Sequence, residues 1–129
     1  MANSATLLGS IPVLTRSGNP EGLLKCFGLV LDTVADLDIL TPAATKYVAV
    51  MGLLAAEATA ANLTVKYGAT PTTLVTLEFP ANFNIIQRID RPLLIVPVAG
   101  AKLILSPSAA ISSAVIYLME ISRLDLLDL

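Results

Sequence analysis

Residues 46–79, KYVAVMGLLAAEATAANLTVKYGATPTTLVTLEF, contain three apolar runs separated by short breaks rich in Ala, Thr, Gly and Pro. In the second and third runs the apolar residues alternate with polar ones, as at Leu63, Val65 and Tyr67. Alternation with a period of two, over short runs bounded by turn residues, indicates strands rather than helices. We therefore expect an all-β fold, a β-sandwich or jelly roll, organised around this stretch.

Similar patterns recur along the rest of the chain, at the spacing of about 8–12 residues that is typical of sandwiches and jelly rolls. About eight or nine short strands are expected, at residues 23–32, 36–40, 47–58, 62–67, 72–79, 83–89, 93–98, 102–105 and 112–122. The segments 62–67 and 72–79 should pair as a hairpin. The Ala-rich residues 53–61 also suit a helix, but the flanking Val, Tyr and Thr favour a strand.

The composition indicates more apolar side chain than a monomer of this size can readily bury. Apolar residues make up 55 % of the 129-residue chain and charged residues only 14 %, against about 25 % charged in a typical domain. The longest apolar run, residues 47–56 between Lys46 and Glu57, is shorter than the ~18–20 residues of a spanning helix. The first residues lack a basic region before an apolar one, so we expect no secretory signal. We therefore expect no membrane insertion, and a homo-oligomer or larger assembly instead.

Three parts of the chain are distinguished by pattern: an N-terminal arm at 1–22, a β-sandwich domain at 23–122 and a C-terminal tail at 123–129. Pro12, the Ser-Gly-Asn-Pro cluster at 17–20 and Gly22 should interrupt any regular element in the arm. Both ends nevertheless carry more apolar residues than a disordered segment does. These residues are the interface candidates: Leu7, Leu8, Ile11, Val13, Leu14, Leu124, Leu126, Leu127 and Leu129. Either end could dock on its own domain or on a neighbouring subunit.

The usual catalytic and metal-binding residues are missing. The chain has no His and a single Cys, Cys26, which removes Ser/His/Asp and Cys/His catalysis and most zinc and iron sites. We expect no enzyme activity, no cofactor and no metal. The 8 basic residues are scattered and aromatic residues make up 5 %, so nucleic-acid binding is not expected. Cys26 lies in an apolar run and is interpreted as a small buried hydrophobe rather than a reactive thiol.

Three carboxylates, Asp32, Asp36 and Asp38, have spacing that could suit Ca²⁺. The segment lacks the glycine and the terminal Glu of an EF-hand loop. Asp36 and Asp38 alternate with Leu37 and Ile39. That alternation favours the polar face of a strand over a metal site.

The order of these segments resembles a known group of proteins. The sequence runs through Leu-x-Ile-x-Thr-Pro at 37–42, an apolar strand at 46–56, NLTVKYGAT at 62–70, TTLVTLEFPAN at 72–82, an apolar strand with Gly at 93–103 and SPSAAISSAVIYLMEI at 106–121. Over roughly residues 36–122 this resembles small virion proteins of tailed bacteriophages, in particular capsid decoration or cement proteins. The resemblance implies a compact sandwich or jelly roll, often trimeric, that reinforces junctions between major capsid subunits through terminal arms. This chain departs from a minimal member of that group by having a longer apolar N-terminal arm and a leucine-rich tail.

The expected function is therefore that of a structural virion protein on the capsid surface, made in the host cytoplasm. Its expected partners are the major capsid protein and further copies of itself, with a trimer favoured. The alternative is a phage tail or fibre component that binds a receptor or carbohydrate through loops 68–73 and 106–112. Those loops lack aromatic residues that stack on sugars. Because residues 47–56 carry no charge, we also expect this strand to be covered on both faces, by the second sheet and by an arm or a neighbour.

Overall fold

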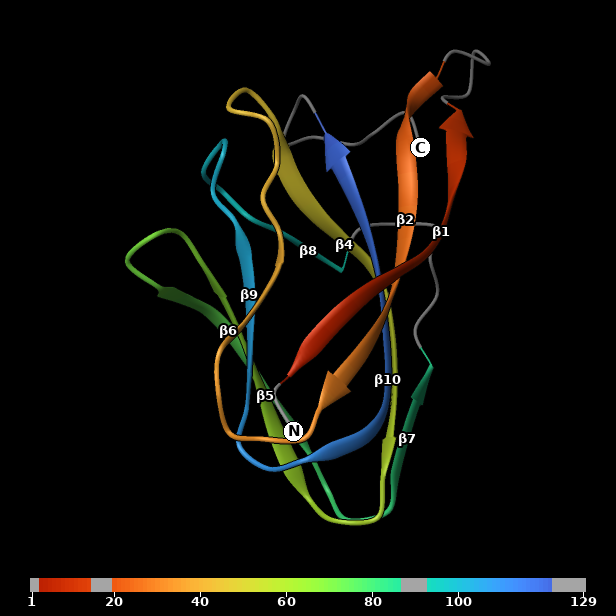
Figure 1. The fold of residues 1–129 in the computed structure, drawn as a ribbon, viewed down its shortest axis with the longest axis vertical. Helices are drawn as coiled ribbons and strands as arrows, with labels where there is room; N and C mark the ends of the chain where they lie inside the picture. The colour runs from red at the N-terminus through yellow and green to blue at the C-terminus, as the bar shows by residue number, and fades with distance from the viewer. Residues whose placement is uncertain (1–2, 15–19, 87–92, 122–129) are drawn as a thin grey trace.

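The structure, a computed structural model, describes residues 3–14, 20–86 and 93–121; for residues 13, 14, 20–22 and 86 it describes the backbone alone. Within these ranges the chain forms ten strands in two antiparallel sheets and no helix (Figure 1). The all-β sandwich predicted from the sequence is confirmed. The described part of the chain accordingly has no helix of the length and apolarity needed to cross a membrane.

The larger sheet has the order β1-β2-β10-β4-β7, and the short β8 also pairs with β4. Its strands are β1 (Ser4–Leu14), β2 (Pro20–Leu31), β4 (Tyr47–Glu57), β7 (Phe83–Ile86), β8 (Leu94–Ile95) and β10 (Ile111–Ile121). The smaller sheet has the order β3-β9-β5-β6. Its strands are β3 (Leu37–Leu40), β5 (Ala61–Tyr67), β6 (Thr72–Phe79) and β9 (Leu103–Pro107).

The strand pairs are nested along the chain. The innermost pair is the β5–β6 hairpin, followed outward by β4 with β7, β3 with β9 and β2 with β10. The hairpin has the predicted partners, with Leu63 opposite Leu77. In its turn Gly68 has a φ of 93°, a backbone conformation that glycine adopts without the steric cost of a Cβ. The outer pairs join segments that lie far apart in the sequence.

The N-terminal segment differs from the prediction. We expected no regular element in residues 1–21, and this was wrong for Ser4–Leu14, which forms β1 and pairs with β2. Leu7 lies opposite Phe27 and Gly9 opposite Cys26, so Leu8 is the extra residue of a β-bulge. A bulge shifts the alternation by one residue, which hides the strand pattern in the sequence. Pro12 is compatible because β1 is an edge strand.

The main hydrophobic core lies between the two sheets. Its fully buried side chains include Leu31, Val48, Leu103, Leu105 and Leu118. They come from strands β2, β4, β9 and β10, so the core joins both sheets along the nested pairs. Burial of each such side chain contributes about 1.5–3 kcal/mol to folding, which makes this core the principal source of stability.

A second cluster lies on the other face of the larger sheet. It comprises Leu24, Ala49, Met51, Met119 and Ile121, all buried. Because side chains alternate across a strand, β4 directs Val48 toward the main core and its neighbour Ala49 toward this cluster. The strand is buried without interruption from Val48 to Leu53. The prediction that this strand is covered on both faces is confirmed; cover by a neighbouring subunit stays a prediction.

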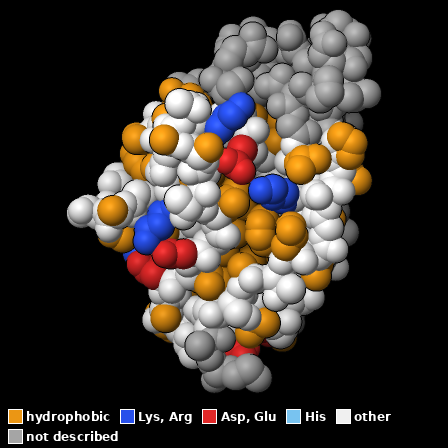
Figure 2. Space-filling model, turned by 45° about the horizontal axis from the view of Figure 1, so that its top comes forward, with side chains coloured by type: hydrophobic (Ala, Val, Ile, Leu, Met, Phe, Trp, Pro, Cys, Tyr) orange, Lys and Arg blue, Asp and Glu red, His pale blue; other side chains and the backbone are white. Residues whose placement is uncertain are grey.

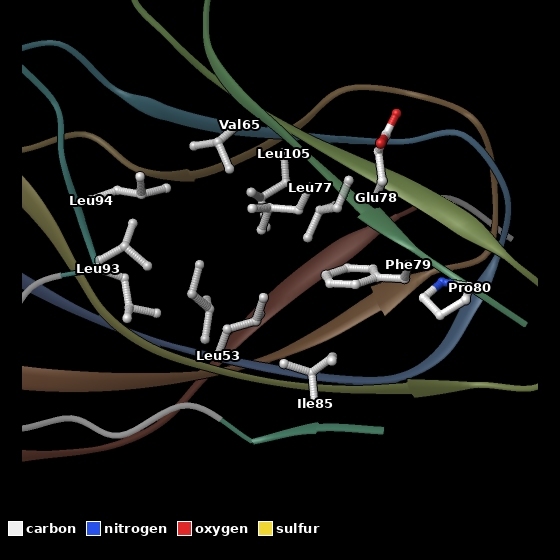
Figure 3. A pocket seen from close by; sticks show the side chains of 13 residues that line it. Leu53, Val65, Leu77, Glu78, Phe79, Pro80, Ile85, Leu93, Leu94 and Leu105 are labelled. Carbon is white, nitrogen blue, oxygen red and sulfur yellow. The ribbon is translucent and has the colours of Figure 1, made fainter. Parts of the chain in front are cut away.

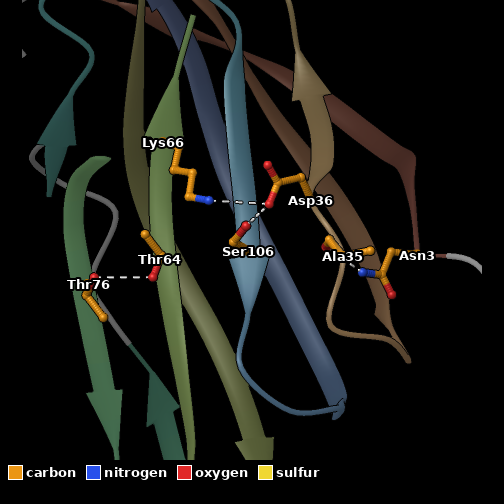
Figure 4. A network of polar contacts seen from close by, with 7 residues as sticks. All are labelled: Asn3, Ala35, Asp36, Thr64, Lys66, Thr76 and Ser106. Atoms are coloured by element: carbon orange, nitrogen blue, oxygen red, sulfur yellow. Dashed lines mark hydrogen bonds and ion pairs between the residues drawn. The ribbon is translucent and has the colours of Figure 1, made fainter. Parts of the chain in front are cut away.

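Asn3 ties the start of β1 to the turn between β2 and β3. Its Nδ2 donates to the carbonyl oxygens of Thr33 and Ala35, both at 2.9 Å, and its Oδ1 accepts from the Thr33 N–H at 2.9 Å. Figure 4 shows the Asn3 side chain directed at Ala35. The beginning of the N-terminal segment therefore docks on its own domain.

Replacing this side chain tests the anchor. Asn3→Ala should lower the free energy of unfolding by about 1–2 kcal/mol, because partly buried backbone groups lose their partners. Hydrogen exchange of the β1 amides should accelerate more than that of β10. Asn84→Ala, at an exposed position of β7, is the matched control and should change stability by less than about 0.5 kcal/mol. If urea titrations gave the same loss of unfolding free energy for both substitutions, Asn3 would not anchor β1.

Candidate functional site

The outer edge of β1 is the candidate site, because this edge strand exposes large apolar side chains. The exposed fraction is 53 % for Leu7, 62 % for Leu8 and 59 % for Ile11. Among the described strands β1 pairs only with β2, so no described strand pairs with its other side. Figure 1 shows β1, in red, at this margin of the larger sheet. Residues 4–14 include no charged residue.

The strand is apolar on both of its faces. Leu7 lies opposite Phe27, a residue of the main core, whereas Ile11 lies opposite Leu24 of the second cluster. Leu8 lies over Gly28, where an added Cβ would come within 3.3 Å of the Leu8 Cδ1. Gly28 thus gives Leu8 room to lie close against β2. Sequence spacing alone would place Leu7 and Ile11, which are four residues apart, on the same face. The bulge at Leu8 changes the phase and puts them on opposite faces.

Leu23 on β2 extends the exposed apolar surface and was not among the predicted interface residues. It lies opposite Pro12 and is exposed. We call Leu7, Leu8, Ile11 and Leu23 the edge patch. In the sequence, Leu23 and Leu24 are adjacent and chemically identical. Nothing local indicates that Leu24 is buried and Leu23 is not.

A shallow hollow of about 330 Å³ adjoins the edge patch on the face that carries the second cluster. It is lined by Leu8, Gly9, Ser10, Ile11, Leu24, Cys26 and Tyr117. Cys26 is a free, half-buried thiol. Burial raises the pKa of the Tyr117 hydroxyl above its ordinary value, and the neighbouring Cys26 raises it further. The Tyr117 hydroxyl therefore stays neutral at pH 7, and the hollow offers a mostly apolar surface beside the strand edge.

Native edge strands are usually protected against pairing with other chains by short length, charged side chains, proline or bulges. β1 has a bulge and Pro12, but it is 11 residues long and uncharged. In Figure 2, hydrophobic side chains form a central strip on the visible face, and charged side chains stand singly or in small groups around it. Exposed apolar surface on an edge strand is typical of sites where another chain docks.

The predicted interface residues fall into two groups. Leu7, Leu8 and Ile11 are brought together on β1. Val13 and Leu14 belong to the same strand, but their side chains lie outside the described part of the structure. The tail candidates Leu124, Leu126, Leu127 and Leu129 lie outside the described residues.

The acidic residues considered for Ca²⁺ take part in polar contacts across the smaller sheet. The Ser106 hydroxyl donates to the Asp36 carboxylate, and the Lys66 Nζ lies 3.5 Å from the same oxygen (Figure 4). Ser106 first, and Lys66 second, lower the pKa of Asp36. Asp38 pairs with Lys102 at 2.8 Å. In the described ranges no three acidic or Cys side chains are grouped where they could hold a metal ion.

Glu57 connects the end of β4 to the start of β10. One carboxylate oxygen accepts from the Ala58 N–H and the other from the Ser112 N–H, both at 2.8 Å. These hydrogen bonds lower the pKa of Glu57, because they favour the charged carboxylate. The arrangement therefore holds the end of β4 against the start of β10.

The lowered pKa values of Glu57 and Asp36 predict acid sensitivity. Each carboxylate stabilises the fold fully above its ordinary pKa, about 4.5 for Glu57 and 3.8 for Asp36. The stabilisation is lost as the pH falls through the lowered folded value. The double variant Glu57→Gln, Asp36→Asn should therefore show a flatter decline in unfolding free energy from about pH 5 to pH 2. Glu78→Gln is the control substitution. A decline as steep in the double variant as in the wild type would contradict the prediction.

Comparisons with protein families, with curated proteins and with solved structures found no match to this chain. A functional proposal for this chain therefore rests on the fold, the edge patch and the sequence resemblance.

Proposed function

We propose that this chain is a structural virion protein, a capsid decoration or cement protein that reinforces a phage head at junctions between major capsid subunits. The observation that carries the proposal is the long, uncharged, apolar edge of β1. Such an edge suits a subunit that binds permanently to other chains. The sequence resemblance to virion proteins is the reason for proposing a phage capsid as the assembly to which it binds.

The strand connectivity supports the same proposal. The pairs β5–β6, β4–β7, β3–β9 and β2–β10 are nested and divided between two sheets. We infer that this is a jelly roll, in which a long antiparallel hairpin is wound into two facing sheets. Jelly rolls are a recurrent architecture of viral capsid domains. On that reading β1 is an additional strand attached to the margin of the jelly roll.

The edge patch would act through two kinds of contact. The outer N–H and C=O groups of β1 can add a strand from a neighbour, and the exposed leucines can enter its apolar surface. A strand of 11 residues is about 35 Å long at about 3.4 Å per residue. At a width of about 10 Å, such an edge offers less than half of the ~800 Å² per partner that a stable interface buries. Further surface of the subunit must therefore contribute.

A homo-oligomer supplies that further surface. The resemblance favours a trimer, with the major capsid protein as the second partner. In this proposal the protein is made in the host cytoplasm and then binds the capsid exterior. It needs no catalytic residue and no cofactor, since its role is to hold other subunits together.

Electron microscopy of a purified particle that carries the tagged chain tests the proposal. We expect density for the β-sandwich at symmetric junctions between capsid subunits, and loss of shell stability when the chain is removed. Density confined to the tail or its fibres would replace the proposal with the receptor-binding alternative. A chain that sediments as a stable monomer and does not bind particles would overturn both.

A further inference from the structure

The two outer faces of the sandwich differ in polarity. The smaller sheet carries the ion pairs Lys66–Asp36 and Lys102–Asp38 on its outer face, as is usual for a face that meets water. On the larger sheet, the described outward side chains of β1, β2, β4, β7 and β10 include no charged residue. This outer face therefore suits contact with protein rather than with water.

Alternation along the strands decides which side chains belong to the outer face of the larger sheet. Figure 3 shows Leu53 of β4 and Ile85 of β7 directed toward the smaller sheet. Their neighbours Leu54 and Asn84 therefore point outward. Val115 lies between two core residues of β10 and points outward as well. The outer face thus continues across the strands on this side of the sheet.

A shallow hollow of about 260 Å³ lies on this face beside β10. Its lining includes Leu54, Ala56, Asn84, Ser113 and Val115. The small side chain of Ala56 forms the floor, because Ser113 and Asn84 lie opposite it in the two adjoining strands. An apolar cavity of about 150 Å³ accommodates benzene. The hollow therefore has room for a leucine side chain.

Leu8 projects from the same face on the other side of β10. Gly28 lies between two core residues of β2 and so belongs to the outer face. The Leu8 side chain lies against it, since an added Cβ at Gly28 would come within 3.3 Å of the Leu8 Cδ1. Leu8 is nevertheless 62 % exposed. Gly28 and Leu54 lie opposite Val115 on its two sides, so Leu8 and the hollow are at a similar level along the strands.

The projection and the hollow are related by the strand order. β10 is the middle strand of β1-β2-β10-β4-β7. A two-fold axis parallel to β10 and above this face would exchange the two sides of the sheet and keep the level along the strands. Such an axis places Leu8 of one copy over the hollow of the second, and the reverse contact forms at the same time. The face is therefore complementary to itself, as a two-fold contact requires.

We propose that a second copy of this chain docks face to face on the outer face of the larger sheet, with Leu8 of each copy in the hollow over Ala56 of the other. Five strands about 4.8 Å apart and residues 113–117 of β10 define an area of about 400 Å². With the strip along β1, this area approaches the ~800 Å² per partner of a stable interface. Leu8 belongs to both surfaces, so one partner covers them together.

This contact deepens the proposed function, on which it rests, by identifying the further surface through which copies of the chain associate. A two-fold contact closes at two copies, whereas the resemblance to virion proteins favours a trimer. The number of copies therefore separates the two ideas. Either can fail while the other stands.

Sedimentation velocity of the purified chain, without particles and over a range of concentrations, measures that number. We expect a monomer–dimer equilibrium. A trimer would overturn the face-to-face contact and leave the capsid proposal standing. A monomer at every concentration would also overturn the contact, and its binding to particles would still support the capsid proposal. A dimer that binds no particle would have the opposite meaning.

Two arginine variants locate the contact on the sheet. Asn84→Arg places a charge at the rim of the hollow and should weaken dimerisation at least about tenfold, because the charge would be desolvated. Thr76→Arg adds the same charge at an exposed position of β6, in the smaller sheet, and should leave the dimer affinity unchanged. Equal dimer affinity of the two variants would overturn the contact.

A disulfide between introduced thiols tests the arrangement directly. In a Cys26→Ala background, Leu8→Cys and Asn84→Cys place thiols on β1 and β7, the two outermost strands of the five. Four strand spacings, about 19 Å, exceed the ~7 Å that a disulfide can span between Cα atoms. Oxidation should therefore join residues 8 and 84 of different copies, as mass spectrometry of peptides would show. Leu8→Cys with Thr76→Cys is the control and should give no mixed link. A dimer without the 8–84 link would overturn the arrangement.

Discussion

Met119→Asp should lower the free energy of unfolding by about 4 kcal/mol or more, enough to unfold much of the chain. Met119 is fully buried in the second cluster on β10. A carboxylate there would be removed from water without a partner, and such burial costs several kcal/mol. Typical domains are stable by only about 5–15 kcal/mol in total. Urea denaturation followed by circular dichroism measures the loss.

Ser113→Asp provides the control on the same strand. Ser113 is exposed and lies an even number of residues from Met119, so that both belong to one face of β10. Its change should stay within about 0.5 kcal/mol. If Met119→Asp proved as mild as Ser113→Asp, the second cluster would be open to water in solution. The larger sheet would then have a single buried face.

Local pattern was sufficient for most strands of the domain. The prediction for residues 72–79 matches β6 at both ends, because a clean alternation is bounded there by Pro71 and Pro80. The Ala-rich segment proved to be strand through Glu57, so the helix alternative for residues 53–61 was wrong for its first five residues. Strand length and flanking residues outweighed the helix propensity of alanine.

Long-range pairing could not be inferred from local pattern. β2 pairs with β10 and β3 with β9 because the nested winding brings both ends of the chain together. No short window of sequence contains that information. The absence of charge in residues 47–56 did predict burial on both faces. It did not indicate that Ala49, Met51 and Met119 would form a separate cluster.

The sequence pointed to the apolar residues of the candidate site, but it did not predict the strand that presents them. The apolar residues Leu7, Leu8 and Ile11 were singled out because a disordered segment rarely carries so many of them. Their strand was missed because the bulge at Leu8 breaks the alternation. The anchor at Asn3 gave no signal in the sequence, because a single Asn near a terminus has no distinctive pattern.

The edge patch leads to the second large effect, which concerns self-association. The double variant Leu8→Lys, Ile11→Lys should weaken association of the subunits at least about 100-fold, equivalent to about 2.7 kcal/mol. Lysine on an edge strand opposes pairing with another chain, because its charge would have to be desolvated at the contact. The unfolding free energy of the monomer should change by less than about 1 kcal/mol, because both side chains are more than half exposed.

Sedimentation velocity over a range of concentrations, with particle binding as a second readout, measures that effect. Val34→Lys, Val98→Lys is the matched control, since both valines are exposed hydrophobic residues outside the strands and the added charge is the same. If both double variants weakened association equally, general charge repulsion would explain the result and the β1 edge would have no special role. If only the β1 variant failed to associate and to bind particles, with its sandwich intact, the edge of β1 would be established as the contact through which the protein assembles.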